Sequence, residues 1–354
     1  MRKKISYILI ILLIFLIVGC NKSHEDGKVN FFEIQEATKV AMDYMKELSL
    51  GNNEEANKFA SNKVIDQDQF SKLKENRING YKLDEVAEGA NFAYLNYLVI
   101  RDSARELRTD LDTIVVKVIK KDDNYLVDEV KAKSNKQVYE ANGVLRIRDE
   151  ESGKSEVLIR KKDFPREVYP KKENVVLNKE TVPEGNFNKI SISFGGNKIG
   201  VTTTDGSKTF IALAMVEESK PTAGSEANAD GASTEDIDKA IDDALEKPII
   251  DKLTGYDLIE GSEIEKLIFS GDDGELMVQV REEGKGSSVR IYRNPTGELL
   301  KFQLMKLFPN DKYNVNIKRV NEKNVFIEVT GIGEEKEAEG EYKVDLKAMK
   351  VNKL

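Results

Sequence analysis

The feature of this sequence that most constrains its fold is a change of hydrophobic period close to Gly80. Before this point apolar side chains recur every three or four positions, as on one face of a helix. After it apolar and polar residues alternate, as in half-buried strands, and Asp122-Asp123-Asn124 supplies turn residues between two of the runs. Four such runs are present: Tyr81 to Val86, Asn91 to Ile100, Leu111 to Lys120 and Asn124 to Lys131. We therefore expect helices followed by an antiparallel sheet.

The helical part is expected to contain three helices. An apolar stripe marks the first one and comprises Ile34, Ala37, Ala41, Tyr44, Met45 and Leu48. Asn30 and Glu33 fit a capping box before it, and Gly51 is placed to end it. Asn53 is a suitable cap for a second helix through Ala60, and a third is expected from about Asp68 to Ile78.

This order of elements resembles the NTF2-like superfamily, especially its small extracytoplasmic versions on bacterial lipoproteins. The resemblance covers about residues 31–134 and rests on Gly51-Asn52-Asn53-Glu54-Glu55-Ala56 and on the closing strand Tyr125-Leu126-Val127-Asp128-Glu129-Val130. It implies an α+β fold with a cone-shaped sheet that often encloses a pocket, used for binding by many members and for catalysis by a few. No Asp–His pair is present for catalysis. Four aromatic residues are candidates for lining a pocket, or else ordinary core: Phe59, Phe92, Tyr94 and Tyr97.

Beyond Ser134 strand-like runs continue to about Glu217 and resume after Pro248. Three-strand meanders recur at about 190–215, 264–292 and 313–346, and they resemble β-propeller blades in the loose TolB-like or WD40-like sense. A β-sandwich or an open sheet is the alternative. A Pro-, Gly- and Ser-rich linker and a short acidic helix are expected at about 218–247. The predicted fold class is thus an α+β NTF2-like domain at 31–134, followed by an all-β domain of repeated antiparallel meanders at 135–354.

The first twenty residues predict export. Basic residues at positions 2–4 precede an apolar run from Ile5 to Val18, about 14 residues, which is too short to span about 30 Å of hydrocarbon. The run ends in Ile17-Val18-Gly19-Cys20, which resembles the lipobox of a bacterial lipoprotein signal peptide. The resemblance implies a signal peptide at 1–19, a lipidated tether at 20–30 and acyl chains such as palmitate on Cys20. A plain secretory signal cleaved elsewhere and a short uncleaved anchor are the alternatives.

Charge and composition limit the partners and the chemistry. The chain has 55 Lys and Arg residues against 63 Asp and Glu residues, a net charge of −8, so anionic lipid and nucleic acid repel it. The acyl chains on Cys20 would therefore hold it at the membrane, and no nucleic-acid partner is expected. Cys20 is the single cysteine and His24, in the tether, is the single histidine. This composition argues against thiol catalysis, His-based catalysis and His-rich metal sites.

The remaining short motifs indicate turns or solvated surface. Glu226, Asn228, Asp230 and Gly231 open like a calcium loop, but its twelfth position is Ile237, which cannot supply a carboxylate. Two acid pairs lie in turns and are expected to face water: Asp272-Asp273-Gly274-Glu275 and Asp122-Asp123. Two Gly/Lys hairpins lack P-loop spacing: Gly195-Gly196-Asn197-Lys198 and Gly284-Lys285-Gly286-Ser287. Two basic runs are expected on solvated surface: Arg160-Lys161-Lys162 and Lys171-Lys172. We assign no catalytic, metal or cofactor residue.

The sequence favours a lipid-anchored protein on the extracytoplasmic face of a cell membrane. Its expected role is non-enzymatic binding or scaffolding, with an envelope protein, peptide or glycan as partner. If the cell has two membranes, Asn21 after the cysteine resembles outer-membrane sorting. The alternatives are a carboxylate-based hydrolase of cell-wall polymer, which needs two convergent acids in one cleft, and a small-ligand carrier that uses the NTF2-like pocket.

Overall fold

The computed structural model describes residues 31–66, 76–171, 178–216, 247–300, 304–321 and 324–354. The chain divides into two units, Met1–Glu33 and Ile34–Leu354, and the second unit contains every element named below. Of the described residues 58% lie in strands and 12% in helices, so the fold is nearly all-β.

Helix α2 (Ile34–Leu50) forms where the helical period predicted it, and it buries the expected stripe of Ala37, Ala41, Tyr44 and Met45. Gly51 ends the helix at φ +78°, a left-handed conformation that glycine adopts without a steric cost. The two helices that follow are single turns, α3 (Asn53–Asn57) and α4 (Asn62–Asp66).

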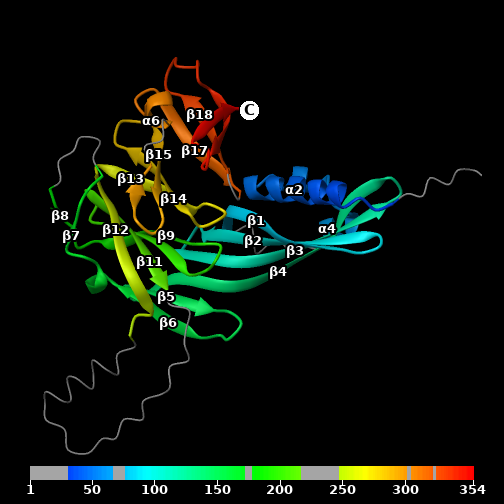
Figure 1. The fold of residues 1–354 in the computed structure, drawn as a ribbon, viewed down its shortest axis with the longest axis horizontal. Helices are drawn as coiled ribbons and strands as arrows, with labels where there is room; N and C mark the ends of the chain where they lie inside the picture. The colour runs from blue at the N-terminus through cyan, green and yellow to red at the C-terminus, as the bar shows by residue number, and fades with distance from the viewer. Residues whose placement is uncertain (1–30, 67–75, 172–177, 217–246, 301–303, 322–323) are drawn as a thin grey trace, which may run out of the picture. The chain divides into compact units, whose positions relative to one another are not determined.

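A six-stranded antiparallel sheet follows, in the order β1-β2-β3-β4-β5-β6. Its strands are β1 (Asn76–Glu88), β2 (Phe92–Ser103), β3 (Arg108–Lys121), β4 (Asn124–Ala141), β5 (Val144–Asp149) and β6 (Ser155–Arg160). Helix α2 lies against β1 to β4 (Figure 1). Leu95, Tyr97, Ile114 and Val116 are buried at alternate positions of β2 and β3, as the period of two requires.

The predicted fold class is wrong. Among the described residues α2 is the one helix longer than five residues, and an α+β NTF2-like domain is not shown. Strand β4 continues past Ser134 to Ala141 and pairs with β5, so the sheet extends to Arg160. Most of the predicted third helix lies outside the described residues, and its last positions, Asn76 to Ile78, begin β1. Pairing of these residues with β2 outweighs a weak local helical pattern.

Three four-stranded antiparallel meanders complete the fold, with strands where the sequence predicted the three recurring runs. The first contains β9 (Asn186–Ile192), β10 (Lys198–Thr204), β11 (Lys208–Val216) and β12 (Ile250–Glu260). The second contains β13 (Ser262–Phe269), β14 (Glu275–Glu282), β15 (Ser287–Arg293) and β16 (Glu298–Leu299). The third contains β17 (Tyr313–Val320), β18 (Asn324–Gly331), β19 (Gly340–Asp345) and β20 (Lys350–Lys353). The small elements are a 3-10 turn at Lys161–Asp163, the hairpin of β7 (Glu167–Val168) with β8 (Glu180–Thr181), and α6 (Leu304–Leu307).

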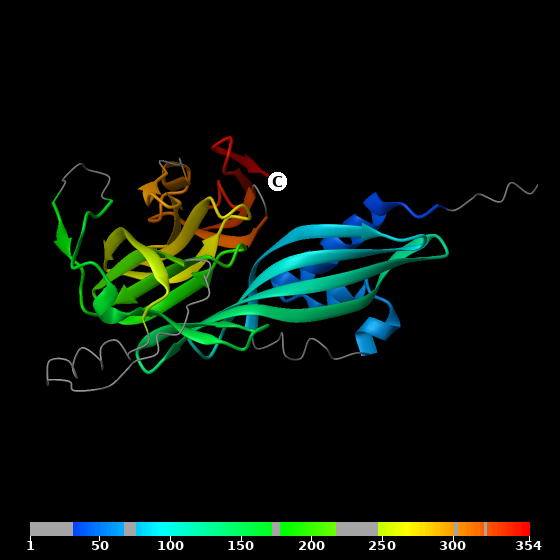
Figure 2. The same cartoon turned by 60° about the horizontal axis from the view of Figure 1, so that its bottom comes forward.

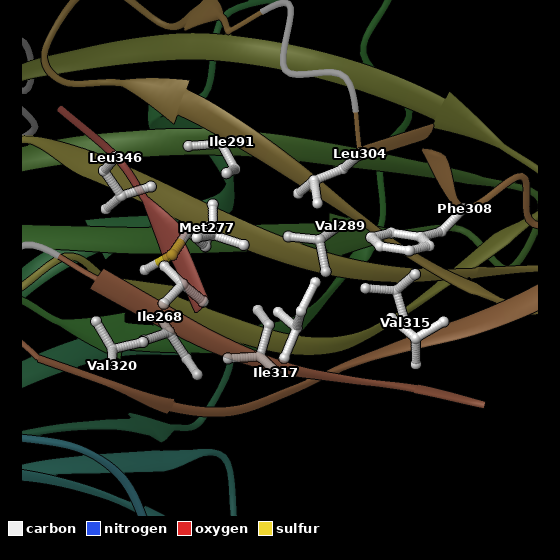
Figure 3. Close-up of a cluster of buried hydrophobic side chains, with 14 of the residues drawn as sticks. Ile268, Met277, Val289, Ile291, Leu304, Phe308, Val315, Ile317, Val320 and Leu346 are labelled. Carbon is white, nitrogen blue, oxygen red and sulfur yellow. The ribbon is translucent and has the colours of Figure 1, made fainter. Parts of the chain in front are cut away.

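The sheets pack in chain order through shared apolar cores. Leu145 and Ile192 belong to the core between the six-stranded sheet and the first meander, and Leu213 and Phe269 to the core between the first and second meanders. Figure 3 shows the core between the second and third, with Met277 facing the β17 side chains. Strand β17 then returns to β1, so the contacts form a cycle in which β13 also touches β9 and β1 (Figure 2). This cycle places the first strand of each meander beside the six-stranded sheet.

No helix of the described part of the chain is both long enough and apolar enough to cross a membrane. Several predicted features lie outside the described residues: the signal segment, Cys20, the linker and the calcium-like loop at 226–237. They therefore stay predictions.

Candidate anion-binding site

A cleft of about 570 Å³ lies where the end of α2 meets the first strands of three sheets. Its described lining residues are Leu48, Ser49, Leu50, Gly51 and Asn53 from the end of α2 and the start of α3, Asn76, Arg77, Ile78 and Asn79 from β1, Lys266 from β13, and Lys318 from β17. Three of these side chains are cationic, and no described residue that lines the cleft is Asp or Glu. The cleft is therefore positively charged within an acidic protein.

A β-bulge lies at the cleft in each of the three strands. The register shifts between Ile78 and Gly80 in β1, between Ile264 and Lys266 in β13, and on either side of Lys318 in β17. A bulge adds one residue to a strand and changes the direction of the side chains beside it, often next to a functional site. The three strands that contribute basic residues to the cleft are thus each irregular beside it.

The positive charge of the cleft is only partly compensated. Lys318 forms an ion pair of 3.2 Å with Glu328, whereas neither Arg77 nor Lys266 pairs with a carboxylate of the described residues. The ammonium of Lys266 is half-buried and donates a hydrogen bond of 2.5 Å to the carbonyl of Ile317. Burial, and then repulsion by Lys318 and Arg77, lowers the pKa of Lys266. A bound anion would offset this repulsion.

Asp102 on β2 lies behind the wall of the cleft. The side-chain amide of Asn79 donates a hydrogen bond to it, and the charge of Asp102 also acts on Lys266. Burial raises the pKa of Asp102 to about 7, although the Thr109 hydroxyl and the Lys189 ammonium oppose the shift. The carboxyl group therefore changes its charge close to neutral pH.

Two further buried acids on the neighbouring strand are bound by other side chains. Asp110 accepts hydrogen bonds from Gln137 at 2.9 Å and from Asn76 at 3.3 Å, and burial raises its pKa. Asp112 forms an ion pair with Arg101. These carboxylates hold the residues around the cleft in place. Across the described ranges, no group of three or more His, Cys, Asp or Glu side chains is arranged to hold a metal ion.

The predicted turns are present, but one expectation about them was wrong. Asp273 does not face water: it is 9% exposed, and its carboxylate accepts hydrogen bonds from the backbone N–H of Phe194 at 2.8 Å and of Gly195 at 2.7 Å. The Asp272-Asp273-Gly274 turn and the Gly195-Gly196 turn are thus brought together. The positive φ of Asp273, +57°, belongs to the tight turn that carries this side chain, and the contact is structural. The hairpin at Gly284 and the turn at Asp122 form as expected.

The four aromatic candidates are not brought together. Tyr97 is buried beside Tyr81, with ring centroids 6.2 Å apart, on the face that α2 covers. Phe92 and Tyr94 project from the other face of β2, where the ammonium of Lys117 lies over both rings at 5.2 and 5.8 Å from the centroids. Phe59 is half-buried near α3. These residues therefore do not line one pocket.

The basic runs also differ from one another. Lys161 and Lys162 line a second hollow of about 680 Å³ together with Phe164 and Pro183. Lys171 donates its backbone N–H to Asp257 at 2.7 Å, and Lys172 lies outside the described residues.

Sequence patterns alone do not identify Arg77, Lys266 and Lys318 as site residues. Each lies in a different strand, and no motif joins them. One available signal was Lys266 itself, which directly precedes the apolar run Leu267-Ile268-Phe269.

No protein-family model matches this chain, and no match was found among curated proteins. Among solved structures the chain is similar to Kluyveromyces lactis Hsv2, with 8% identity over 72% of this chain and 66% of that chain, at a TM-score of 0.25. A putative 6-phosphogluconolactonase from Bacteroides fragilis gives 14% identity over 77% of this chain and 69% of that one, at 0.28. Prolyl oligopeptidase B from Galerina marginata shows 8% identity over 83% of this chain and 43% of that chain, at a TM-score of 0.26. The chain spans just under two thirds of the length of this Hsv2 structure and of a variant with a replaced loop, and 90% of another Hsv2 structure. Scores this low carry no argument about this protein.

Proposed function

We propose that this protein is a non-enzymatic binding module that holds an anionic ligand in the cleft between α2, β1, β13 and β17. One observation carries the proposal: Arg77, Lys266 and Lys318 converge from three strands, and no described acid lines the space between them. Charges of one sign repel each other when they are brought together in a half-buried place. An anion removes that cost and makes charge-assisted hydrogen bonds with the same groups.

We also propose that acyl chains on Cys20 hold this module on the extracytoplasmic face of a cell membrane. The support is the sequence before Cys20, together with a net charge of −8 that anionic lipid would repel. Two or more acyl chains anchor a protein stably, at about 0.8 kcal/mol for each buried methylene. Replacing Cys20 with Ser should move the protein from the membrane fraction to the soluble fraction, and retention in the membrane would contradict the anchor.

Binding is preferred to hydrolysis because of the residues in the cleft. Hydrolysis of a wall polymer by carboxylates needs two acids on opposite sides of the substrate. Of the acids nearest to the cleft, Asp110 is buried and Asp102 is half-buried, and each accepts a hydrogen bond from a cleft asparagine, Asn76 or Asn79. An anionic glycan or a peptide carboxylate would suit the cations of the cleft. Glycan and peptide partners therefore both stay predictions.

Calorimetric titration of the purified protein with inorganic phosphate in a chloride buffer tests the anion site. Arg77→Gln and Lys266→Gln should each weaken phosphate binding about tenfold, since a hydrogen bond to a charged group contributes roughly 1.5–3 kcal/mol. Lys347→Gln is the matched control, because Lys347 is an exposed lysine outside the cleft and the charge change is identical. No phosphate binding, or an equal loss in the control, would overturn the proposal.

A further inference from the structure

The C-terminal end of α2 also lines the cleft. The last four carbonyls of a helix have no partner within the helix. Here the N–H groups of Gly51 and Asn52 bond to the carbonyls of Leu48 at 3.0 Å and Glu47 at 2.9 Å. No backbone N–H of the described residues bonds to the carbonyls of Ser49 or Leu50, and both residues line the cleft. Two hydrogen-bond acceptors are therefore available at this end of the helix.

The end of α2 also carries negative charge. Aligned peptide dipoles place about half a negative charge at a helix C-terminus, which attracts cations and hydrogen-bond donors. α2 has 17 residues, and no basic residue lies in its last turn to compensate that charge. Figure 1 shows this end of the helix beside β1 and β17, the strands that carry Arg77 and Lys318. Cationic side chains and the negative end of a helix dipole therefore line the same cleft.

We infer that the ligand is an aminoalkyl phosphate, whose phosphate binds Arg77, Lys266 and Lys318 and whose ammonium group binds the Ser49 and Leu50 carbonyls. This inference rests on the proposed function and adds the chemical class of the ligand. A phosphate dianion compensates three cations, one of them already paired with Glu328, better than a single carboxylate does. The planar guanidinium of Arg77 suits two phosphate oxygens at once.

A ligand with only one kind of charge fits the cleft less well. A simple anion would leave the helix carbonyls to water and would be repelled by the helix end. A simple cation would be repelled by the three basic side chains. A volume of about 570 Å³ leaves room for a short chain between the two charged ends.

A pair of matched ligands tests the inference. O-phosphoethanolamine and propyl phosphate have the same length, and a methyl group replaces the ammonium group in the second. O-phosphoethanolamine should bind the wild-type protein about fivefold more tightly, within the range of helix-end charge interactions. If propyl phosphate binds equally well while inorganic phosphate binds, the inference fails and the anion site stands. If none of the three binds, the proposed function fails as well.

Two variants assign the two ends of the ligand. Asn53→Lys places a competing ammonium group beside the end of α2. It should reduce the ratio of the affinities for O-phosphoethanolamine and propyl phosphate to about one without loss of phosphate binding. Asn57→Lys is its control, because Asn57 is exposed on the same short helix and does not line the cleft. Arg77→Gln should weaken both ligands about equally and keep their ratio. A changed ratio in Arg77→Gln, or an unchanged one in Asn53→Lys, would contradict the assignment of the ends.

An aminoalkyl phosphate occurs free or as the head group of phosphatidylethanolamine. Phosphatidylcholine vesicles with and without phosphatidylethanolamine, compared with free O-phosphoethanolamine, distinguish the two sources. Binding to the free compound or selective binding to the phosphatidylethanolamine vesicles supports the inference and identifies the source. Binding to neither one overturns it.

Discussion

Two regions of this protein gather charged side chains, and they differ in how the charges are compensated. Asp257 on β12 is 1% exposed and accepts hydrogen bonds from the Lys171 and Leu258 N–H groups at 2.7 and 2.9 Å. It also accepts hydrogen bonds from the Tyr292 hydroxyl at 2.7 Å and from Arg290 at 3.2 Å. In the cleft, by contrast, three cations have one described carboxylate partner among them, Glu328.

The difference separates a structural use of charge from a binding use. A buried ion pair supported by several hydrogen bonds holds one packing arrangement, and losing one partner leaves an uncompensated charge. The surplus charge of the cleft costs the folded protein some stability, and a ligand from outside would compensate it. Variants in the two regions should therefore have opposite effects on stability and on binding.

The largest effect is expected for Asp257→Ala. This change leaves Arg290 unpaired and two backbone N–H groups without an acceptor, so it should lower the free energy of unfolding by about 3–5 kcal/mol. Urea denaturation measures the loss. Asp251→Ala is the control, because Asp251 is an exposed residue of the same strand and should change stability by less than about 0.5 kcal/mol. Equal losses of unfolding free energy in the two variants would show that the ion pair and hydrogen bonds of Asp257 do not stabilise the fold.

A smaller effect, which depends on pH, is expected for Asp102→Asn. The folded pKa of Asp102, about 7, lies above its ordinary value of 3.8, so the folded state binds more protons between these two values. The free energy of unfolding should therefore fall as the pH rises through this window, by up to roughly 4 kcal/mol. Asn stays neutral and should remove this fall, which unfolding at about pH 5 and pH 8 would show. Asp84→Asn, an exposed change in the same sheet, should keep the wild-type slope.

The smallest effect on stability is expected for Arg77→Gln. Arg77 is exposed and repels Lys266, so its removal should change the free energy of unfolding by less than about 0.5 kcal/mol, toward higher stability. The same variant should lose phosphate binding, which is the reverse of the result for Asp257→Ala. A large loss of stability in Arg77→Gln would make the cleft a structural feature like the Asp257 network.

Local features of the fold were predictable because they depend on neighbouring residues. The stripe from Ala37 to Met45 predicted α2, Gly51 predicted its end, and the alternation in Leu111 to Lys120 predicted β3. The fold class was wrong because the sheet did not stop near Ser134: polar residues such as Gln137 extend β4, where pairing with β3 decides the structure. Sequence patterning also misplaced Asp273, since it showed the turn but not the neighbouring hairpin that binds the carboxylate.

The sequence by itself determined where the chain alternates, where it turns and which side chains each strand can bury. Only the tertiary structure decided that Arg77, Lys266 and Lys318 share one cleft with the end of α2. The reason is physical: alternation fixes the two faces of a strand, whereas the packing of one sheet on the next decides which strands become neighbours. A register shift lies beside the cleft residues in each of the three strands.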